Sequence, residues 1–270
     1  MRSGPPGNQE QTRIVHNATG ALNPTHGAAS VARVEGVLFD IDDTLVDLNS
    51  ASIKGFHQLT AEDFRDIPAA LREHAARDYA DDAAGAYERY MAGELTFLGQ
   101  RAERIRRAYG LVGVEAPPAE AIGLWSARYE DVVQSMWAPF PDVHDCLDEL
   151  DALSIPYGAV SNNVEDYQRN KLLLAGLERI AVLVGSDTAG APKPDPRPFH
   201  AGCRLLGTSI DATLYVGDNP VNDVQGAKAA GLQGILLDRA ADHKNGPAGI
   251  LQNLGSLASL IRGNPGFLGA

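Results

Sequence analysis

Short apolar runs alternate with longer amphipathic stretches along most of this chain. Each apolar run has the length and composition of a buried β-strand, and the stretches between the later runs are helix-like. Buried strands joined by helical crossovers are typical of a parallel sheet. The pattern therefore predicts an α/β fold with a doubly wound parallel sheet. The runs are GVLFDI (36–41), PYGAVSN (156–162), IAVLVGSD (180–187), ATLYVGDN (212–219) and LQGILLD (232–238).

One long segment interrupts this alternation. Residues 49–137 contain no strand-like run and instead show helical patterning, with prolines at the start of the last stretch. We expect a small bundle of about four helices there. Because the bundle is inserted directly after the first strand, it should lie over the carboxyl end of that strand as a cap. Pro139 and Pro141 mark the return to the sheet.

The N-terminal segment differs from both of these regions. Residues 1–33 are rich in Gly, Pro, Asn, Thr and Ala and show neither helical nor strand periodicity. This composition favours a mobile tail over a targeting peptide. The predicted organisation is therefore a tail at 1–33, an α/β core formed by 34–48 and 139–270, and a helical cap at 49–138.

Composition limits the partners and the compartment. Thirty-five acidic residues against 23 Lys and Arg give a formal charge of −12, and no basic block could neutralise a row of phosphates. We therefore expect neither a nucleic acid nor a membrane as a partner. No apolar run approaches the roughly 18 residues of a membrane span, so the expected location is cytoplasmic. Cys146 and Cys203 lie in amphipathic stretches and are interpreted as buried apolar side chains.

Unusual polar residues lie at the ends of four of the apolar runs. Asp40 and Asp42 follow the VLF of the first run, Ser161 follows the GAV of the second and Asp218 follows the TLYVG of the fourth, while Lys193 comes after the third through a short loop. Ligands in open α/β sheets bind at the carboxyl ends of the strands. Each residue taken singly is explained by ordinary turn chemistry, because Asp, Ser, Asn, Gly and Pro all favour turns. Their convergence on one sheet edge favours a functional site.

These residues also resemble the motifs of a known family. DIDDT at 40–44, Ser161 in VSNN, Lys193 in KPDP and GDNPVND at 217–223 resemble the four motifs of the haloacid dehalogenase-like (HAD) hydrolases, in order and separation. The resemblance covers about residues 35–240, and its specificity comes from the agreement of four dispersed motifs. It points to the phosphatase branch with a helical (C1-type) cap.

The crowded carboxylates predict a cation at this edge. Like charges this close cannot all stay ionised cheaply in a partly buried site unless a cation or a proton intervenes. The resemblance implies Mg²⁺, held by the Asp40 carboxylate, the Asp42 backbone carbonyl and the Asp218 carboxylate, with water and a phosphate oxygen completing the shell. By the same resemblance, Asp223 orients Asp218 or its waters.

The resemblance also implies a role for each group in hydrolysis. Asp40 would attack phosphorus and form an aspartyl-phosphate, and Asp42 would protonate the leaving alkoxide and then activate water. Lys193 and Ser161 would contact the phosphoryl oxygens. Three further expectations concern neighbouring residues: Thr44 orients the Asp42 side chain, Asn162 offers a backbone contact to the phosphate, and Asp43 is a turn residue.

Several alternatives share these features. The dehalogenase branch lacks the second aspartate, and the phosphonate branch has a small residue there, so Asp42 favours phosphate esters. A phosphomutase would use the same groups, and a non-catalytic binding protein would retain the fold without turnover. The expected substrate is a small phosphorylated metabolite: a sugar phosphate, a phosphoglycolate-like acid or a nucleoside monophosphate. The oligomeric state stays open, and solvated positions are as compatible as substrate contacts with Lys54, His57, Arg65, Arg72 and Arg101.

Overall fold

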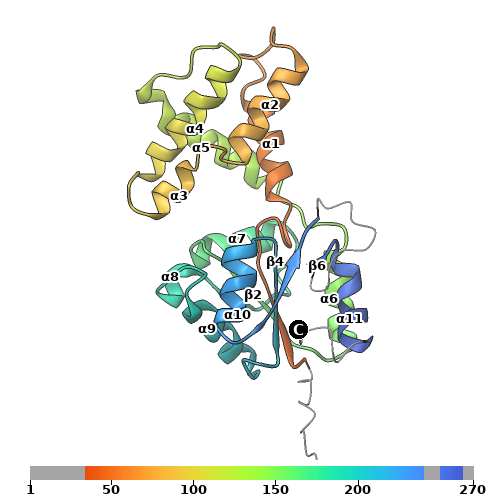
Figure 1. Ribbon diagram of the computed structural model, residues 1–270. Helices are drawn as coiled ribbons and strands as arrows, with labels where there is room; N and C mark the ends of the chain where they lie inside the picture. Colours follow the sequence, from red (N-terminus) through yellow and green to blue (C-terminus); the bar gives the residue numbers. More distant parts are fainter. Residues whose placement is uncertain (1–33, 240–249, 264–270) are drawn as a thin grey trace, which may run out of the picture. The chain divides into compact units, whose positions relative to one another are not determined.

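The computed structural model describes residues 34–239 and 250–263 (Figure 1). All described residues belong to one compact unit of the chain. The predicted tail at 1–33 therefore lies outside the described residues.

Within the described ranges, six parallel strands form one sheet in the order β3-β2-β1-β4-β5-β6. Five of them coincide with the five apolar runs, which confirms the predicted α/β class. The sixth consists of two residues and is too short to produce a recognisable run. The strand order diverges from β1, with β2 on one side and β4 on the other, so β1 ends at the switch point of the sheet. The strands are β1 (Gly36–Phe39), β2 (Tyr157–Val160), β3 (Val182–Val184), β4 (Thr213–Gly217), β5 (Gln233–Leu237) and β6 (Ile250–Leu251).

Helices cover both faces of this sheet, with α6 and α11 on one face and α9 and α10 on the other (Figure 1). The alternation of side chains along β1 explains this arrangement. Val37 and Phe39 belong to the larger apolar core, which includes residues of α6 and α11, whereas Leu38 packs into a smaller core with residues of α9 and α10. The helices of this part are α6 (Val143–Ala152), α7 (Glu165–Leu174), α8 (Ser186–Ala189), α9 (Pro196–Leu206), α10 (Gly226–Ala229) and α11 (Leu257–Gly263), with short turns η2 (Pro220–Gln225) and η3 (Leu254–Ser256).

The segment between β1 and α6 is helical, as predicted, and contains no strand. Four helices of two turns or more match the expected bundle of about four. A shorter fifth helix, α3, arises because the helix-like sequence AALREHAARDYADDAAGAYERYM (69–91) is broken into two helices. Asp82 and Gly85 adopt positive φ angles of 50° and 67° at that break, which a continuing helix cannot accommodate. The helices are α1 (Leu48–Leu59), α2 (Ala69–Ala80), α3 (Ala86–Met91), α4 (Phe97–Leu111) and α5 (Ile122–Gln134), with a short turn η1 (Ala119–Ala121).

Aromatic rings hold this bundle together. Phe56 of α1, Tyr79 of α2 and Trp125 and Tyr129 of α5 are buried, and their ring centroids lie 4.8 to 6.1 Å apart in the contacting pairs. Such pairs add stability beyond the apolar area they bury.

The boundaries of the cap, set at 49 and 138, stay a prediction. Every helix that the structure describes is too short or too polar to cross a membrane.

Candidate active site

The carboxyl ends of three neighbouring strands bring the predicted polar residues to one edge of the sheet. Asp40 follows β1, Ser161 follows β2 and Asp218 follows β4. Backbone hydrogen bonds extend the sheet pairing into these positions, because the Asp40 N–H donates to Val216 O at 2.9 Å and the Ser161 N–H donates to Val184 O at 2.9 Å. The rigid sheet therefore fixes the backbone from which these side chains project.

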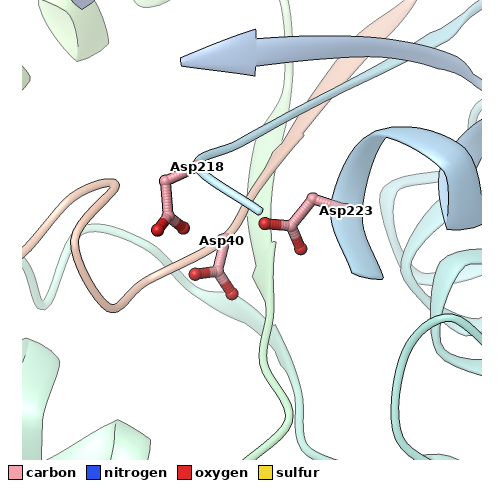
Figure 2. Close-up of side chains that lie close together, drawn as sticks. All are labelled: Asp40, Asp218 and Asp223. Carbon is pink, nitrogen blue, oxygen red and sulfur yellow. The ribbon is translucent and has the colours of Figure 1, made fainter. Parts of the chain in front are cut away.

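Three aspartates form an acidic cluster at this edge. Asp40, Asp218 and Asp223 can each offer one carboxylate oxygen such that all three oxygens lie within 4.8 Å of one another (Figure 2). Asp40 and Asp223 are buried, whereas Asp218 is exposed. Carboxylate oxygens are the preferred ligands of small hard cations, and one open side leaves room for water or a phosphate oxygen. The donor set therefore fits a divalent ion such as Mg²⁺.

The turn after β4 places Asp223 through its own hydrogen bonds. The Asn219 side chain accepts from Val221 N at 3.0 Å and from Asn222 N at 2.9 Å, and Asp223 Oδ2 accepts from Asn219 N at 2.9 Å. A Cβ atom on Gly217 would lie only 2.3 Å from Asp223 Oδ2, so a side chain there would displace the carboxylate. The glycine and the first asparagine of GDNPVND thus have structural reasons to be there.

Lys193 supplies the positive charge on this side of the site. Its ammonium group donates to Asp40 Oδ1, to Asp223 Oδ1 at 2.7 Å and to Tyr215 Oη at 2.8 Å, and Tyr215 in turn donates to Val160 O at 2.9 Å. Burial opposes the charge on Lys193, but Asp40 and Asp223 outweigh burial and raise the lysine pKa. The lysine is therefore held as a cation between two carboxylates.

Asn162 fixes the loop that carries this lysine. Its side-chain Oδ1 accepts from Lys193 N at 2.6 Å, and its Nδ2 donates to Lys193 O at 3.0 Å. The amide is thus engaged on both sides by the backbone of Lys193. The expected contact between the Asn162 backbone and a phosphate stays a prediction.

The Asp42 side chain is engaged by helix α7. Lys171 Nζ donates to Asp42 Oδ1, and Gln168 Nε2 donates to Asp42 Oδ2 at 2.8 Å. The same Gln168 amide donates to Ser161 Oγ at 2.8 Å. Sequence reasoning missed both α7 residues, because a glutamine and a lysine three positions apart in an amphipathic stretch normally face water.

The hydroxyl of Thr44 contacts the aspartate that follows β4. It donates to Asp218 Oδ1 at 3.3 Å, and the expectation that Thr44 orients Asp42 stays a prediction. The turn after β1 is tight, since Asp43 has a φ of 58° and donates its N–H to Val46 O at 2.8 Å. Asp43 is thus the turn residue that we expected, and its carboxylate accepts from Asn49 N at 2.8 Å.

Crowding raises the pKa of several carboxyl groups at this edge. Burial raises the pKa of Asp40 well above its usual range, Lys193 opposes this rise, and Asp223 adds to it. Loss of hydration within the crowded cluster, together with Asp223, raises the pKa of Asp218 to about 6. Burial likewise raises the pKa of Asp43 to about 7. A bound divalent cation would oppose each of these rises, because an opposite charge nearby favours the ionised form.

A cavity of about 1020 Å³ lies beside Asp42 and is lined mainly by helices α1 to α5 and α7. Of the five basic residues considered from the sequence, Arg101 lines this cavity, whereas Lys54, His57, Arg65 and Arg72 do not. Arg104 lines it as well. Arg101 pairs with Glu130 at 3.2 Å, and Tyr167 of α7 donates to the same glutamate. The cavity thus places the helical segment and the predicted acid Asp42 around one space.

Comparison with known proteins identifies the class to which this fold and site belong. The family model described as haloacid dehalogenase-like hydrolase matches residues 34–231. The chain therefore belongs to the haloacid dehalogenase-like hydrolases, which confirms the resemblance seen in the four motifs and the expectation of an enzyme.

Two proteins of similar sequence and one solved structure illustrate this relationship. The chain is 30% identical over 207 residues to a phosphoglycolate phosphatase of Xylella fastidiosa strain Temecula1, covering 74% of this chain and 78% of the relative. A phosphoglycolate phosphatase of Xylella fastidiosa strain 9a5c is 37% identical over 110 residues, covering 40% of this chain and about half (48%) of the relative. The HAD-hydrolase YfnB from Bacillus subtilis, solved with bound magnesium, shares the fold with a TM-score of 0.66 at 21% identity, over 85% of this chain and 99% of YfnB.

Proposed function

We propose that this protein is a Mg²⁺-dependent phosphatase that hydrolyses a small phosphorylated metabolite through an aspartyl-phosphate at Asp40. The observation that carries the proposal is the acidic cluster of Asp40, Asp218 and Asp223 with Lys193 bound to two of its members. The two Xylella relatives are named phosphoglycolate phosphatases, and they support a phosphate ester as the substrate.

The carboxylates of Asp40 and Asp218 and the backbone carbonyl of Asp42 would hold the metal ion. Asp223, whose two oxygens accept from Lys193 Nζ and Asn219 N, would orient Asp218 or the waters of the ion. When bound, Mg²⁺ would neutralise charge on the phosphate oxygens and hold the phosphate near Asp40. Asp40 then attacks phosphorus and displaces the alkoxide, so one difficult step is divided into two. Lys193 and Ser161 bind phosphoryl oxygens as charge moves onto them.

Asp42 acts on the leaving group. Its side chain lines the 1020 Å³ cavity, where the organic part of the ester would lie. In the first step it donates a proton to the departing alkoxide, and in the second it removes a proton from the water that attacks the phosphoaspartate. A halide needs no such proton, so the presence of Asp42 supports phosphate ester hydrolysis over dehalogenation.

The cavity supports a small-molecule substrate. Its size lies at the upper end of the range for small-molecule sites, and its lining combines four aromatic rings with nine charged side chains. A sugar phosphate, a phosphoglycolate-like acid and a nucleoside monophosphate all fit within this volume. We further propose that the protein works in the cytoplasm and binds neither nucleic acid nor membrane, in keeping with its charge of −12.

A substrate screen tests the proposal. The purified protein is incubated with a panel of phosphorylated metabolites and Mg²⁺, and released phosphate is measured beside Asp40→Asn, which differs by one atom type in the attacking group. We expect phosphate release from at least one small ester with the natural protein and none with the variant. Equal release by both proteins, or no release from any ester, would contradict the proposal.

A further inference from the structure

A second buried lysine contacts the site from helix α7. Lys171 is 1% exposed, and its ammonium group pairs with Asp42. The same group lies 4.9 Å from the ring centre of Trp137 and 5.2 Å from that of Tyr167. A buried ammonium needs a negative partner to offset its lost hydration. Among the residues that the structure describes, Asp42 is the acid that forms this ion pair, so Lys171 contacts the predicted acid–base group.

Gln168 reinforces the same contact one helical turn earlier. It is fully buried, and its Nε2 donates to Asp42 Oδ2 and to Ser161 Oγ, each at 2.8 Å. Residues three apart on a helix share a face, so Gln168 and Lys171 reach Asp42 together. Both carboxylate oxygens of Asp42 therefore accept a hydrogen bond from α7, and Gln168 links Asp42 to Ser161 after β2.

The two buried lysines pair with different carboxylates of the site. Lys193 binds Asp40 and Asp223, and Lys171 binds Asp42. The acidic cluster that fits a metal contains Asp40, Asp218 and Asp223 but not the Asp42 side chain. A carboxylate without the α7 contacts would be free to turn toward a cation bound two residues away.

We propose that Lys171 and Gln168 are positioning residues for the reaction. They hold the Asp42 carboxylate at the wall of the cavity, where it meets the leaving group, and keep it out of the metal cluster. This inference rests on the proposed function, because it assigns the residues that make Asp42 available for proton transfer. A merely structural role would instead make them stabilise the junction of β1 and α7 without affecting one chemical step selectively.

The test compares the rate of alcohol release in single turnovers with Mg²⁺ for an alkyl phosphate and an aryl phosphate. Lys171→Met keeps the length of the side chain but removes its donors, and Gln168→Met does the same for the amide. Lys228→Met, at an exposed position on α10, is the matched control. Because an alkoxide leaves poorly without a proton, we expect both α7 variants to slow the alkyl ester at least about 10-fold more than the aryl ester.

The possible outcomes separate the two proposals. An equal loss on both esters in Gln168→Met, and in Lys171→Met if that variant folds, would overturn the positioning role, provided that Asp42→Asn itself slows the alkyl ester selectively. No turnover of any ester by the natural protein would instead contradict the proposed function. A selective loss in both α7 variants, with the Lys228→Met control unchanged, supports the inference.

Discussion

The two buried lysines of the site, Lys193 and Lys171, have similar exposure but different surroundings. They are 4% and 1% exposed, and each contacts an aspartate near the end of β1. Lys193 shares its ammonium among Asp40, Asp223 and Tyr215, whereas Lys171 lies beside two aromatic rings and pairs with one acid. The comparison shows how one sheet edge can hold several carboxylates, because each lysine pairs with different ones. In the proposed mechanism, Lys193 would act on the phosphate and Lys171 on the group that protonates the leaving alcohol.

Of all the changes, removal of the divalent metal should reduce activity most. With a chelator we expect activity to be abolished, because the cluster of Asp40, Asp218 and Asp223 would lose the cation that favours its ionised form. Ca²⁺ should not restore activity, since it takes 6 to 8 ligands at roughly 2.3–2.6 Å and would alter the position of Asp40. Phosphate release is measured with added Mg²⁺, Ca²⁺ or chelator. Full activity in the chelator would exclude a metal role on the Lys193 side.

Asp42→Asn tests the role of the acid that pairs with Lys171. The variant cannot donate a proton, so we expect turnover of alkyl esters to fall roughly 10²- to 10⁴-fold. The loss in the first step should be smaller for an aryl ester, whose leaving group needs less protonation. Rates of alcohol and phosphate release are measured separately to distinguish the two steps. Equal losses of alcohol release for both esters would argue against the acid role.

Lys193→Met should weaken both catalysis and stability. We expect kcat to fall about 10²- to 10³-fold, the usual effect of losing one donor to a developing charge. Removal of one partner from a buried ion pair costs about 3–5 kcal/mol, here because Asp40 and Asp223 stay buried without their cation. Thermal unfolding of both variants is measured with and without Mg²⁺. The ion should restore part of the stability that Lys193→Met loses and little of the stability that Lys171→Met loses. Equal recovery in both variants would mean that the two lysines do not serve separate sides.

Asn162→Ala should have the smallest effect. It leaves every charged group in place but removes both hydrogen bonds to the backbone of Lys193. We expect kcat to fall on the order of 10-fold, as for other residues that orient a group in the site without contacting the reaction. Asn163→Ala, at the adjacent position, is the control for a general disturbance of the loop. A loss as large as that of Lys193→Met would indicate direct contact with the phosphate.

The same comparison shows what the sequence could and could not predict. Lys193 was recognisable because it lies in a Pro-rich loop after an apolar run, where strand-end chemistry is expected. Lys171 was not, because a lysine within an amphipathic helix normally points to water. Its contacts include Trp137 and Asp42, which are distant in the sequence, besides Tyr167 one turn earlier on α7. The hydrogen bond of Thr44 to Asp218 was not predicted either, because the two residues lie 174 positions apart in the sequence.

The fold was more predictable than the contacts within the site. Buried parallel strands produce continuous apolar runs, so β1 to β5 could be placed from composition and length. The two-residue β6 produces no such signal, and the break before α3 depends on the positive φ at Asp82 and Gly85. Side-chain partners across the sheet edge depend on register and packing, which one sequence does not encode in any short pattern.

Trapping the phosphorylated enzyme tests the central claim most directly. Asp42→Asn is mixed with an aryl phosphate and Mg²⁺, quenched in acid and digested, and the peptides are analysed by mass spectrometry. We predict a phosphoryl group on Asp40, because the first step proceeds with a good leaving group while the second lacks its base. The double variant with Asp40→Asn should carry none. Turnover of the aryl ester without phosphorylation of Asp40, or phosphorylation of another residue, would contradict the account.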